Sequence, residues 1–301
     1  MTEHSGDQKA LLDKAVKMFV DATPPVGAPI EDWRAGFEGM AANFEIPADA
    51  VIEEIDSDGV PGRKVRAPGA QENRLVLHFH SGGYVQGSSL SYRNFAYRLS
   101  AVTGATVVVP DYRLAPENLY PAAVEDARTV YEWALKTWDP ARIVISGDSA
   151  GGGLAMATLL LVRDNNLPKP AAGVGISALL DLAGEGASME ECASTDPLID
   201  RNMVVEMGKV YIGDIDPRKN PYCSPLWGEH HDLPPIFLLA SHSEVLRDDS
   251  VRFAESVRAA GGEVRLSLPE DMVHIWTFFP FLDQAAASLE EIGQFVKSRV
   301  S

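Results

Sequence analysis

The sequence feature that most constrains the fold is the alternation of short, continuously apolar runs with helical stretches along most of the chain. Runs such as RLVLHFH, ATVVVP and RIVISG are apolar at almost every position, and not only at every second one. Such runs are typical of strands that are buried on both faces of a parallel sheet. The pattern predicts strands at residues 75–79, 106–109, 143–146, 173–177, 236–240 and 264–268, and helices at residues 91–102, 122–136, 152–163, 250–260 and 281–299. Strands that alternate with helices in this way predict an α/β fold.

Three regions depart from this rhythm. Residues 1–48 carry apolar side chains at helical spacing and predict two amphipathic helices ahead of any strand. Residues 51–67 predict two strands joined by a tight turn at Asp58-Gly59, which brings the mostly parallel sheet to about eight strands. Residues 180–225 have a helical pattern without a strand, and we interpret them as an insertion that lies over the sheet.

The bulk composition excludes several classes of partner. The net charge of −17, from 43 acidic against 26 basic residues, repels phosphate backbones, so nucleic acid is not expected to bind. Cys192 and Cys223 form no CxxC pair, so we expect neither a disulfide framework nor a cysteine metal site, and two scattered cysteines fit a reducing cytoplasm. The N-terminus is charged throughout, and no run approaches the roughly 18 apolar residues of a membrane span. The sequence therefore predicts a cytoplasmic protein without membrane insertion.

A nucleophile is predicted where GDSAG, at residues 147–151, matches the pattern GxSxG. RIVIS before it reads as a buried strand, and GGGLAMATLLLV after it reads as a helix. A turn from strand to helix within one residue strains the backbone of Ser149 and tolerates only small neighbours. It also leaves the hydroxyl at a helix N-terminus, where N–H groups favour a developing negative charge. Ser149 is the candidate nucleophile, and Asp148 beside it is a candidate supporting residue.

The candidate general base is His274. A serine hydroxyl needs a base within reach, and in this strand–turn–helix architecture the partners follow in the order serine, acid, histidine. His274 comes after the last predicted strand, where the base is expected. His242 is too early to leave room for an acid before it, and His230 and His231 lie in a polar turn.

The acid has to lie between the strand at residues 236–240 and His274, which leaves Glu244, Asp248 and Asp249. Asp248 and Asp249 immediately precede the helix predicted from residue 250, so we interpret them as N-caps. Glu244 lies in the loop itself, where a carboxylate holds the imidazole in the needed tautomer. Glu244 is the preferred acid, and Asp248 stays open as the alternative.

Donors for an oxyanion hole are predicted in the loop His80-Ser81-Gly82-Gly83, directly after a strand. Side chains would obstruct a backbone that approaches the substrate, which accounts for Gly82 and Gly83. The backbone N–H groups of Gly82, Gly83 and Ala150 are the candidate donors. His80 is interpreted as a hydrogen-bonding brace of this loop and not as a proton carrier.

Together these residues resemble the hormone-sensitive-lipase-like family of α/β-hydrolase esterases, in its bacterial branch. The resemblance rests on HSGG, DYRLAPE at residues 111–117, GDSAGG, SEVLRDD and His274, and covers roughly residues 75–300. It implies an α/β-hydrolase fold, an ester substrate, no cofactor or metal, a supporting role for DYRLAPE and a homodimer through an edge of the sheet. It also implies helical caps at residues 1–48 and at about 180–225 on a catalytic domain of residues 49–301. Candidate pocket residues in these caps, for all of which core packing is the favoured interpretation, are Trp33, Phe37, Met203, Met207 and Tyr211.

Two positions depart from the family pattern. Ser81 stands where the family usually has the first glycine of HGGG, a change expected to narrow the alcohol side of the pocket. Glu244 stands where the family usually has an aspartate. The function predicted is a serine carboxylesterase that hydrolyses short- to medium-chain esters through an acyl-enzyme.

Three alternatives stay open. A lactone hydrolase would use the same triad, because a lactone is a ring ester. An amide hydrolase such as a formamidase is disfavoured by Val85, which stands where the HGGxW motif of those enzymes has tryptophan. A non-catalytic small-molecule binding protein on the same fold is disfavoured by the presence of His274.

Overall fold

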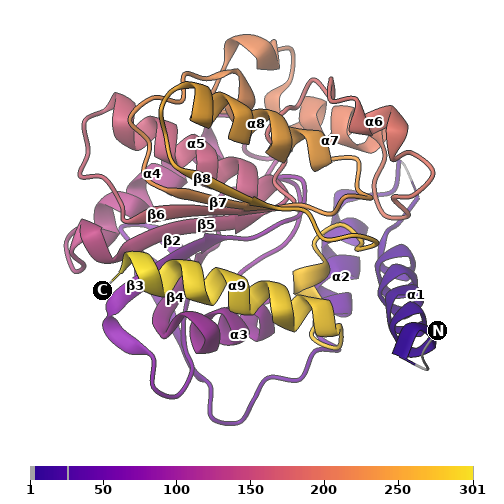
Figure 1. Cartoon of the computed structure of the whole chain (residues 1–301), viewed down its shortest axis with the longest axis horizontal. Helices are drawn as coiled ribbons and strands as arrows, with labels where there is room; N and C mark the ends of the chain where they lie inside the picture. Colours follow the sequence, from indigo (N-terminus) through magenta and orange to yellow (C-terminus); the bar gives the residue numbers. More distant parts are fainter. Residues whose placement is uncertain (1–3, 26, 301) are drawn as a thin grey trace.

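The fold is built around one twisted sheet, seen almost edge-on in Figure 1. A computed structural model describes residues 4–25 and 27–300, and within these ranges the sheet has eight strands in the order β1-β2-β4-β3-β5-β6-β7-β8. The strands from β3 to β8 run parallel, whereas β2 is antiparallel to both of its neighbours. The strands are β1 (Val51–Ser57), β2 (Val60–Arg66), β3 (Gln71–Phe79), β4 (Ala105–Pro110), β5 (Ile143–Asp148), β6 (Ala172–Ile176), β7 (Ile236–Leu239) and β8 (Val264–Ser267). The predicted α/β fold with a mostly parallel sheet of about eight strands is confirmed.

The two antiparallel strands at the start form the predicted hairpin. Ser57 pairs with Val60, and the two residues between them have positive φ angles, 57° at Asp58 and 98° at Gly59. Two consecutive positive φ angles are what a type I′ hairpin turn requires, and this turn matches the twist of the flanking strands. Asp-Gly is one of the few pairs that adopts them at low cost, so the sequence signal was specific here.

Helices cover both faces of the sheet, which explains why its strands are continuously apolar. α3 (Arg93–Thr103) and α9 (Asp283–Arg299) lie on one face, and α4 (Ala122–Ala134), α5 (Ala150–Asp164) and α8 (Arg247–Ala259) lie on the other (Figure 1). Along β3, Leu75 and Leu77 belong to the core on the α5 side, whereas Val76 between them belongs to the core on the α9 side. Since successive side chains point to opposite faces, both sets have to be apolar.

The remaining helices lie at the end of the sheet where the parallel strands finish (Figure 1). They come from the N-terminal segment, as α1 (His4–Ala22) and α2 (Ile30–Ala41), and from the predicted insertion, as α6 (Ser188–Glu191) and α7 (Arg201–Ile212). Residues 180–225 contain no strand, as expected. Four 3-10 helices complete the described chain: η1 (Pro140–Arg142), η2 (Pro217–Lys219), η3 (Pro225–Trp227) and η4 (Trp276–Phe278).

Arg34 attaches the N-terminal segment to the α/β domain. Its guanidinium donates hydrogen bonds to the carbonyl oxygens of Val85 and Ala115, and it forms a salt bridge with Glu117 at 2.7 Å. Ala115 and Glu117 belong to DYRLAPE, so part of that sequence fixes α2 over the loop that follows β3. This position agrees with the supporting role expected for DYRLAPE.

The helix boundary that differs most from the sequence prediction is the start of α8. α8 begins at Arg247, and the residue before it, Leu246, caps the helix without a side-chain hydrogen bond. Asp248 and Asp249 therefore lie in the first turn and are not N-caps, so that interpretation was wrong. Their carboxylates reach across to the insertion instead, where Asp249 accepts hydrogen bonds from the N–H groups of Leu180 and Asp181.

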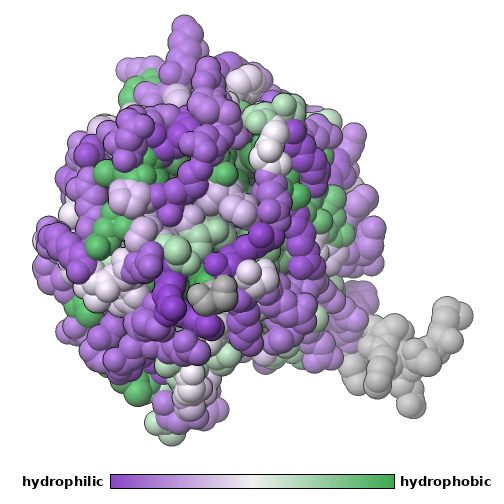
Figure 2. Space-filling model, turned by 60° about the vertical axis from the view of Figure 1, so that its left-hand side comes forward, coloured by the Kyte–Doolittle hydropathy of each residue, from purple (hydrophilic) through white to green (hydrophobic). Residues whose placement is uncertain are grey.

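The surface is mostly hydrophilic on the face drawn in Figure 2, with apolar residues in separate groups between the hydrophilic ones. Among the described residues, no helix combines the length and the apolarity that a bilayer crossing requires. The cytoplasmic location stays a prediction of the sequence.

Candidate active site

Ser149 occupies a strained turn between β5 and α5. Its φ angle is 52° and its ψ angle −122°, a conformation that costs a non-glycine residue roughly 1–3 kcal/mol. The neighbouring positions of this turn have no room for a side chain, and glycines occupy them. A Cβ atom on Gly147 would lie 2.0 Å from the carbonyl oxygen of Gly151, and one on Gly151 would lie 2.1 Å from that of Phe79. Packing against β3 therefore holds the serine in the strained conformation.

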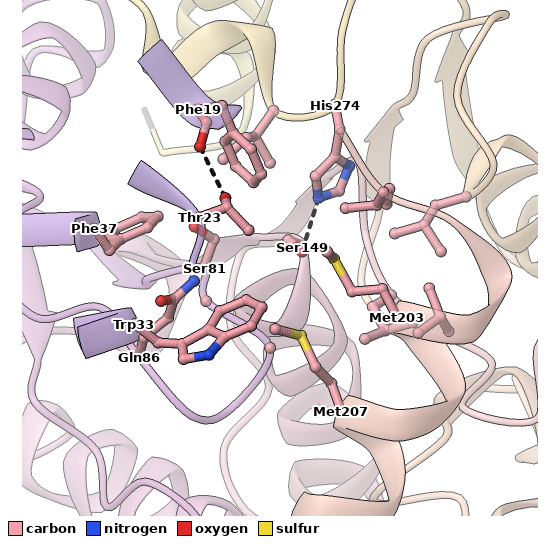
Figure 3. A pocket seen from close by; sticks show the side chains of 17 residues that line it. Phe19, Thr23, Trp33, Phe37, Ser81, Gln86, Ser149, Met203, Met207 and His274 are labelled. Carbon is pink, nitrogen blue, oxygen red and sulfur yellow. Dashed lines mark hydrogen bonds between the residues drawn. The ribbon is translucent and has the colours of Figure 1, made fainter. Parts of the chain in front are cut away.

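The structure brings His274 and Glu244 to Ser149. The Nε2 atom of His274 lies 2.9 Å from Oγ of Ser149, and its Nδ1 atom lies 2.8 Å from Oε2 of Glu244 (Figure 3 shows the first contact). Ser149 is 9% exposed, His274 3% and Glu244 0%. Asp248, the alternative acid, does not join them, because its carboxylate accepts a hydrogen bond from the N–H of Ser188.

Burial and charge oppose each other at this pair. Burial alone would lower the pKa of His274, but the hydrogen bond to Glu244 and the negative charge of Glu244 outweigh it and raise the pKa above the ordinary value of 6.5. Burial raises the pKa of Glu244, and its hydrogen bond with His274 opposes the rise. The second carboxylate oxygen of Glu244 accepts a hydrogen bond of 2.8 Å from the N–H of Ser241, so the carboxylate is held on both sides.

Asp196 of the insertion is a residue that sequence reasoning missed. The residue is 9% exposed, and its carboxylate accepts a hydrogen bond of 3.0 Å from the N–H of Val245, next to Glu244 in the chain. Its negative charge also contributes to the raised pKa of His274. Nothing in the motif TDPLID distinguishes this aspartate from an ordinary turn residue, because its partner lies 49 residues further on.

The loop after β3 carries three consecutive positive φ angles, 119° at Gly82, 61° at Gly83 and 64° at Tyr84. A Cβ atom on Gly82 would lie 2.2 Å from the carbonyl oxygen of Gln86. The N–H groups of Gly82, Gly83 and Ala150 have no hydrogen-bond acceptor among residues 4–25 and 27–300. Gly82 and Gly83 line the same pocket as Ser149. The arrangement offers unpaired donors beside the serine, as an oxyanion hole requires.

His80 contacts this loop and not the serine. Its Nδ1 atom donates to the carbonyl oxygen of Ser81 at 2.8 Å, and its ring stacks on Tyr112 with 4.3 Å between the centroids. Tyr112, from DYRLAPE, donates a hydrogen bond to the carbonyl oxygen of His80. Burial lowers the pKa of His80, so its imidazole is neutral at neutral pH. These contacts fit the bracing role inferred from the sequence.

Asp148 lies beneath the serine, fully buried. One carboxylate oxygen lies 3.2 Å from Nε2 of His78, and the other accepts a hydrogen bond of 2.5 Å from the hydroxyl of Tyr92. No sequence pattern singles out His78 or Tyr92, since each reads as an ordinary core residue in its own element.

A hollow of about 580 Å³, open to solvent, leads to the serine. Figure 3 shows Trp33 and Phe37 on one side of Ser149, and Met203 and Met207 on the other. Apart from His274, none of the described residues that line it has a charged side chain. The residues along its walls are Phe19, Thr23, Trp33, Phe37, Ser81, Gly82, Gly83, Gln86, Ser149, Leu179, Ile199, Met203, Val204, Met207, Leu246, His274 and Ile275.

The core-packing interpretation holds for only some of the candidate pocket residues. Tyr211 does not line the pocket, because it stacks on Tyr84 with 3.8 Å between ring centroids and 4° between the planes. Trp33 and Met203 line the pocket and belong to neither core, so core packing was the wrong expectation for them. Phe37 and Met207 line the pocket too, but Phe37 is also part of a core and Met207 packs against one.

Comparisons with known proteins agree on one class. The family model described as alpha/beta hydrolase fold matches residues 76–278. The chain is 37% identical to an acetyl-hydrolase of Streptomyces hygroscopicus over 77% of this chain and 78% of that protein. It is 30% identical to the esterase LipI of Mycobacterium tuberculosis over 97% of this chain and 96% of that protein.

Solved structures give the same result. An esterase from the bacterial hormone-sensitive lipase family superposes with a TM-score of 0.94 at 34% identity, over 97% of this chain and 99% of that one. The structure of EstE5 soaked with p-nitrophenyl butyrate has a TM-score of 0.90 at 34% identity, over 96% of this chain and 98% of that one.

Proposed function

The chain belongs to the hormone-sensitive-lipase family of α/β-hydrolase esterases and is a serine carboxylesterase, and on that premise we propose that Ser149, His274 and Glu244 are its catalytic triad. The observation that carries the proposal is the continuous chain of hydrogen bonds from Glu244 through His274 to Ser149, at 2.8 and 2.9 Å. This chain of hydrogen bonds ends at a pocket that is also lined by Gly82 and Gly83, whose N–H groups are unpaired among the described residues.

In the first half of the reaction His274 removes the hydroxyl proton of Ser149 through Nε2, and Oγ attacks the ester carbonyl carbon. Glu244 accepts the hydrogen bond from Nδ1 and stabilises the imidazolium that forms. The N–H groups of Gly82, Gly83 and Ala150 donate to the oxyanion, and each such donor is typically worth about 3–4 kcal/mol. His274 then protonates the leaving alcohol.

In the second half water replaces the alcohol. His274 takes a proton from the water, which attacks the acyl-enzyme, and the released Ser149 hydroxyl recovers a proton as the carboxylic acid leaves. These steps use only groups of the chain and water.

The pocket walls support uncharged esters of short to medium acyl chain as substrates. Burying apolar surface contributes roughly 25 cal/mol per Å², and the walls offer apolar side chains on both sides of Ser149. We propose that residues 1–48 and about 180–225 act as the cap over the catalytic domain of residues 49–301. Phe19 of α1, Trp33 of α2 and Met203 of α7 line the pocket, which supports that division.

The assignment is tested with p-nitrophenyl butyrate and a fluorophosphonate probe. Ser149→Ala is expected to lower kcat by at least about 10⁴-fold and to abolish labelling, while circular dichroism stays that of the parent. Retention of full activity by Ser149→Ala would contradict the assignment. A panel of linear esters, lactones and amides at matched concentration separates an esterase from a lactone hydrolase by the ratio of kcat/KM.

We further propose a homodimer through the free edge of β8. β8 pairs with β7 on one side, and no strand of the described residues pairs with its other side. An open strand edge presents unpaired N–H and C=O groups to a second copy. Light scattering on the eluting protein should give twice the chain mass of 32.6 kDa, and a monomer mass at micromolar concentration would reject the dimer.

A further inference from the structure

The hydroxyl of Ser81 takes part in a buried hydrogen-bond network that the proposed mechanism does not use. Ser81 is 2% exposed, in the loop that carries Gly82 and Gly83. Its backbone N–H donates to the hydroxyl of Tyr92 at 3.0 Å, and its Oγ atom lies 2.6 Å from the same hydroxyl. Two atoms of one residue therefore contact a single phenolic oxygen.

The number of protons defines the direction of each bond. Burial raises the pKa of Tyr92 well above its usual value, so the phenol keeps its one proton. The nearest acceptor-only group is the carboxylate of Asp148, at 2.5 Å, and the proton belongs there. The Oγ–H of Ser81 then donates to Tyr92. The phenolic oxygen accepts two hydrogen bonds and donates one, which satisfies it completely.

The network leads to the residue before the nucleophile. Asp148 immediately precedes Ser149, and its other carboxylate oxygen lies 3.2 Å from Nε2 of His78. His78 in turn lies 3.1 Å from Oγ of Ser146 through its Nδ1 atom. The groups that hold Ser149 and the loop that carries Gly82 and Gly83 are thus joined through one tyrosine.

We propose that Ser81 is a positioning residue, whose hydroxyl fixes the oxyanion-hole loop to Asp148 through Tyr92 and so sets the distance between the loop amides and Ser149. The proposal rests on the role given above to Gly82 and Gly83. A glycine at position 81 has no Oγ and leaves the loop with one bond to Tyr92 instead of two. Since donors act on an oxyanion only within a narrow range of distance, a small displacement of the loop reduces kcat.

The test compares Ser81→Ala with wild type on p-nitrophenyl butyrate. We expect kcat to fall by about tenfold or more and KM to change by less than about twofold. A trifluoromethyl ketone, which forms an oxyanion on reaction with the serine, should lose affinity by the same factor as kcat/KM. Ser81→Thr keeps a hydroxyl and should recover most of kcat.

Ser100→Ala is the matched control. Ser100 is equally buried, and its Oγ donates to the carbonyl oxygen of Ala105 and accepts from the N–H of Ala67, away from the site. The Ser100→Ala variant should have a lower melting temperature, while its kcat stays within about twofold of wild type. If Ser81 had only a structural role, Ser81→Ala would likewise lower the melting temperature and leave kcat within about twofold of wild type.

A double-mutant cycle with Tyr92→Phe tests the connection itself. Because Tyr92→Phe already removes the partner of Ser81, the double variant should lose no more kcat than Tyr92→Phe alone. The proposal is overturned if the double variant loses kcat by the product of the two single losses, or if Ser81→Ala keeps the kcat of wild type. It is also overturned if Ser81→Ala raises only KM, which would mean that Ser81 shapes the alcohol side of the pocket. A wrong triad assignment would show differently, because Ser149→Ala would then retain activity.

Discussion

Glu244 and His274 lie 30 residues apart in the chain, yet Oε2 of the carboxylate lies 2.8 Å from Nδ1 of the imidazole. The two side chains come from loops at the carboxyl ends of neighbouring strands β7 and β8. Asp248, only four residues after Glu244, sits in the first turn of α8, where it binds the N–H of Ser188. We therefore propose Glu244, the residue in the loop, as the acid, because α8 places Asp248 away from the imidazole.

Glu244→Gln should lower kcat by about 10³- to 10⁴-fold. Glutamine keeps the shape of the side chain but neither selects the required tautomer nor stabilises the imidazolium. Steady-state rates on p-nitrophenyl butyrate measure the loss. Asp248→Asn is the control and should stay within about threefold of wild type, since Asp248 does not contact His274. The opposite order of the two effects would reassign the acid.

The pH dependence of kcat/KM should have an acidic limb with its midpoint above 6.5. His274 acts as a base only when neutral, and its pKa is raised above that ordinary value, so activity is lost as the pH falls through the raised pKa. Asp196→Asn removes a negative charge that contributes to the rise but retains an oxygen for the N–H of Val245. The midpoint should move to lower pH in this variant, and an unchanged midpoint would mean that Asp196 does not act on His274.

Met207→Ala should shift the preference toward longer acyl chains. The Sδ atom of Met207 lies 2.4 Å from the position of a Cβ atom on Gly83, so this side chain fills the space above the oxyanion loop. Its truncation should raise the ratio of kcat/KM for p-nitrophenyl octanoate over butyrate by about fivefold or more, since each methylene accommodated contributes about 1 kcal/mol. Met189→Ala removes a buried methionine outside the pocket and should lower stability without changing the ratio.

Two glycine-to-alanine changes should have opposite effects on stability. Gly151→Ala should lower the free energy of unfolding by at least about 2 kcal/mol, because the new Cβ would lie 2.1 Å from the carbonyl oxygen of Phe79. Gly39→Ala, on the exposed side of α2, meets no atom within 4 Å and should raise it by about 0.5–1 kcal/mol. Urea unfolding measures both values. A stable Gly151→Ala protein would show that the turn is not held by β3.

Local patterns were sufficient for the parts of the fold that depend on local contacts. The continuous apolar runs predicted the parallel strands, because burial on two faces requires apolar residues at successive positions. Asp58-Gly59 predicted the hairpin, because two consecutive positive φ angles favour this pair of residues. The start of α8 was misplaced for the converse reason. Asp248 and Asp249 resemble N-caps locally, but their partners Ser188 and Leu180 are distant in the chain.

By itself the sequence determined which residues are candidates for the chemistry of the site, since a GxSxG turn, a late histidine and a glycine-rich loop each follow their own strand. Only the tertiary structure decided which side chains support them. The Asp196 contact with Val245, the Tyr84 stack on Tyr211 and the contact of Ser81 with Tyr92 join segments whose separate sequences give no sign of pairing. A hydrogen bond between distant segments depends on where packing brings two backbones together, and that distance is not encoded in the neighbours of either residue.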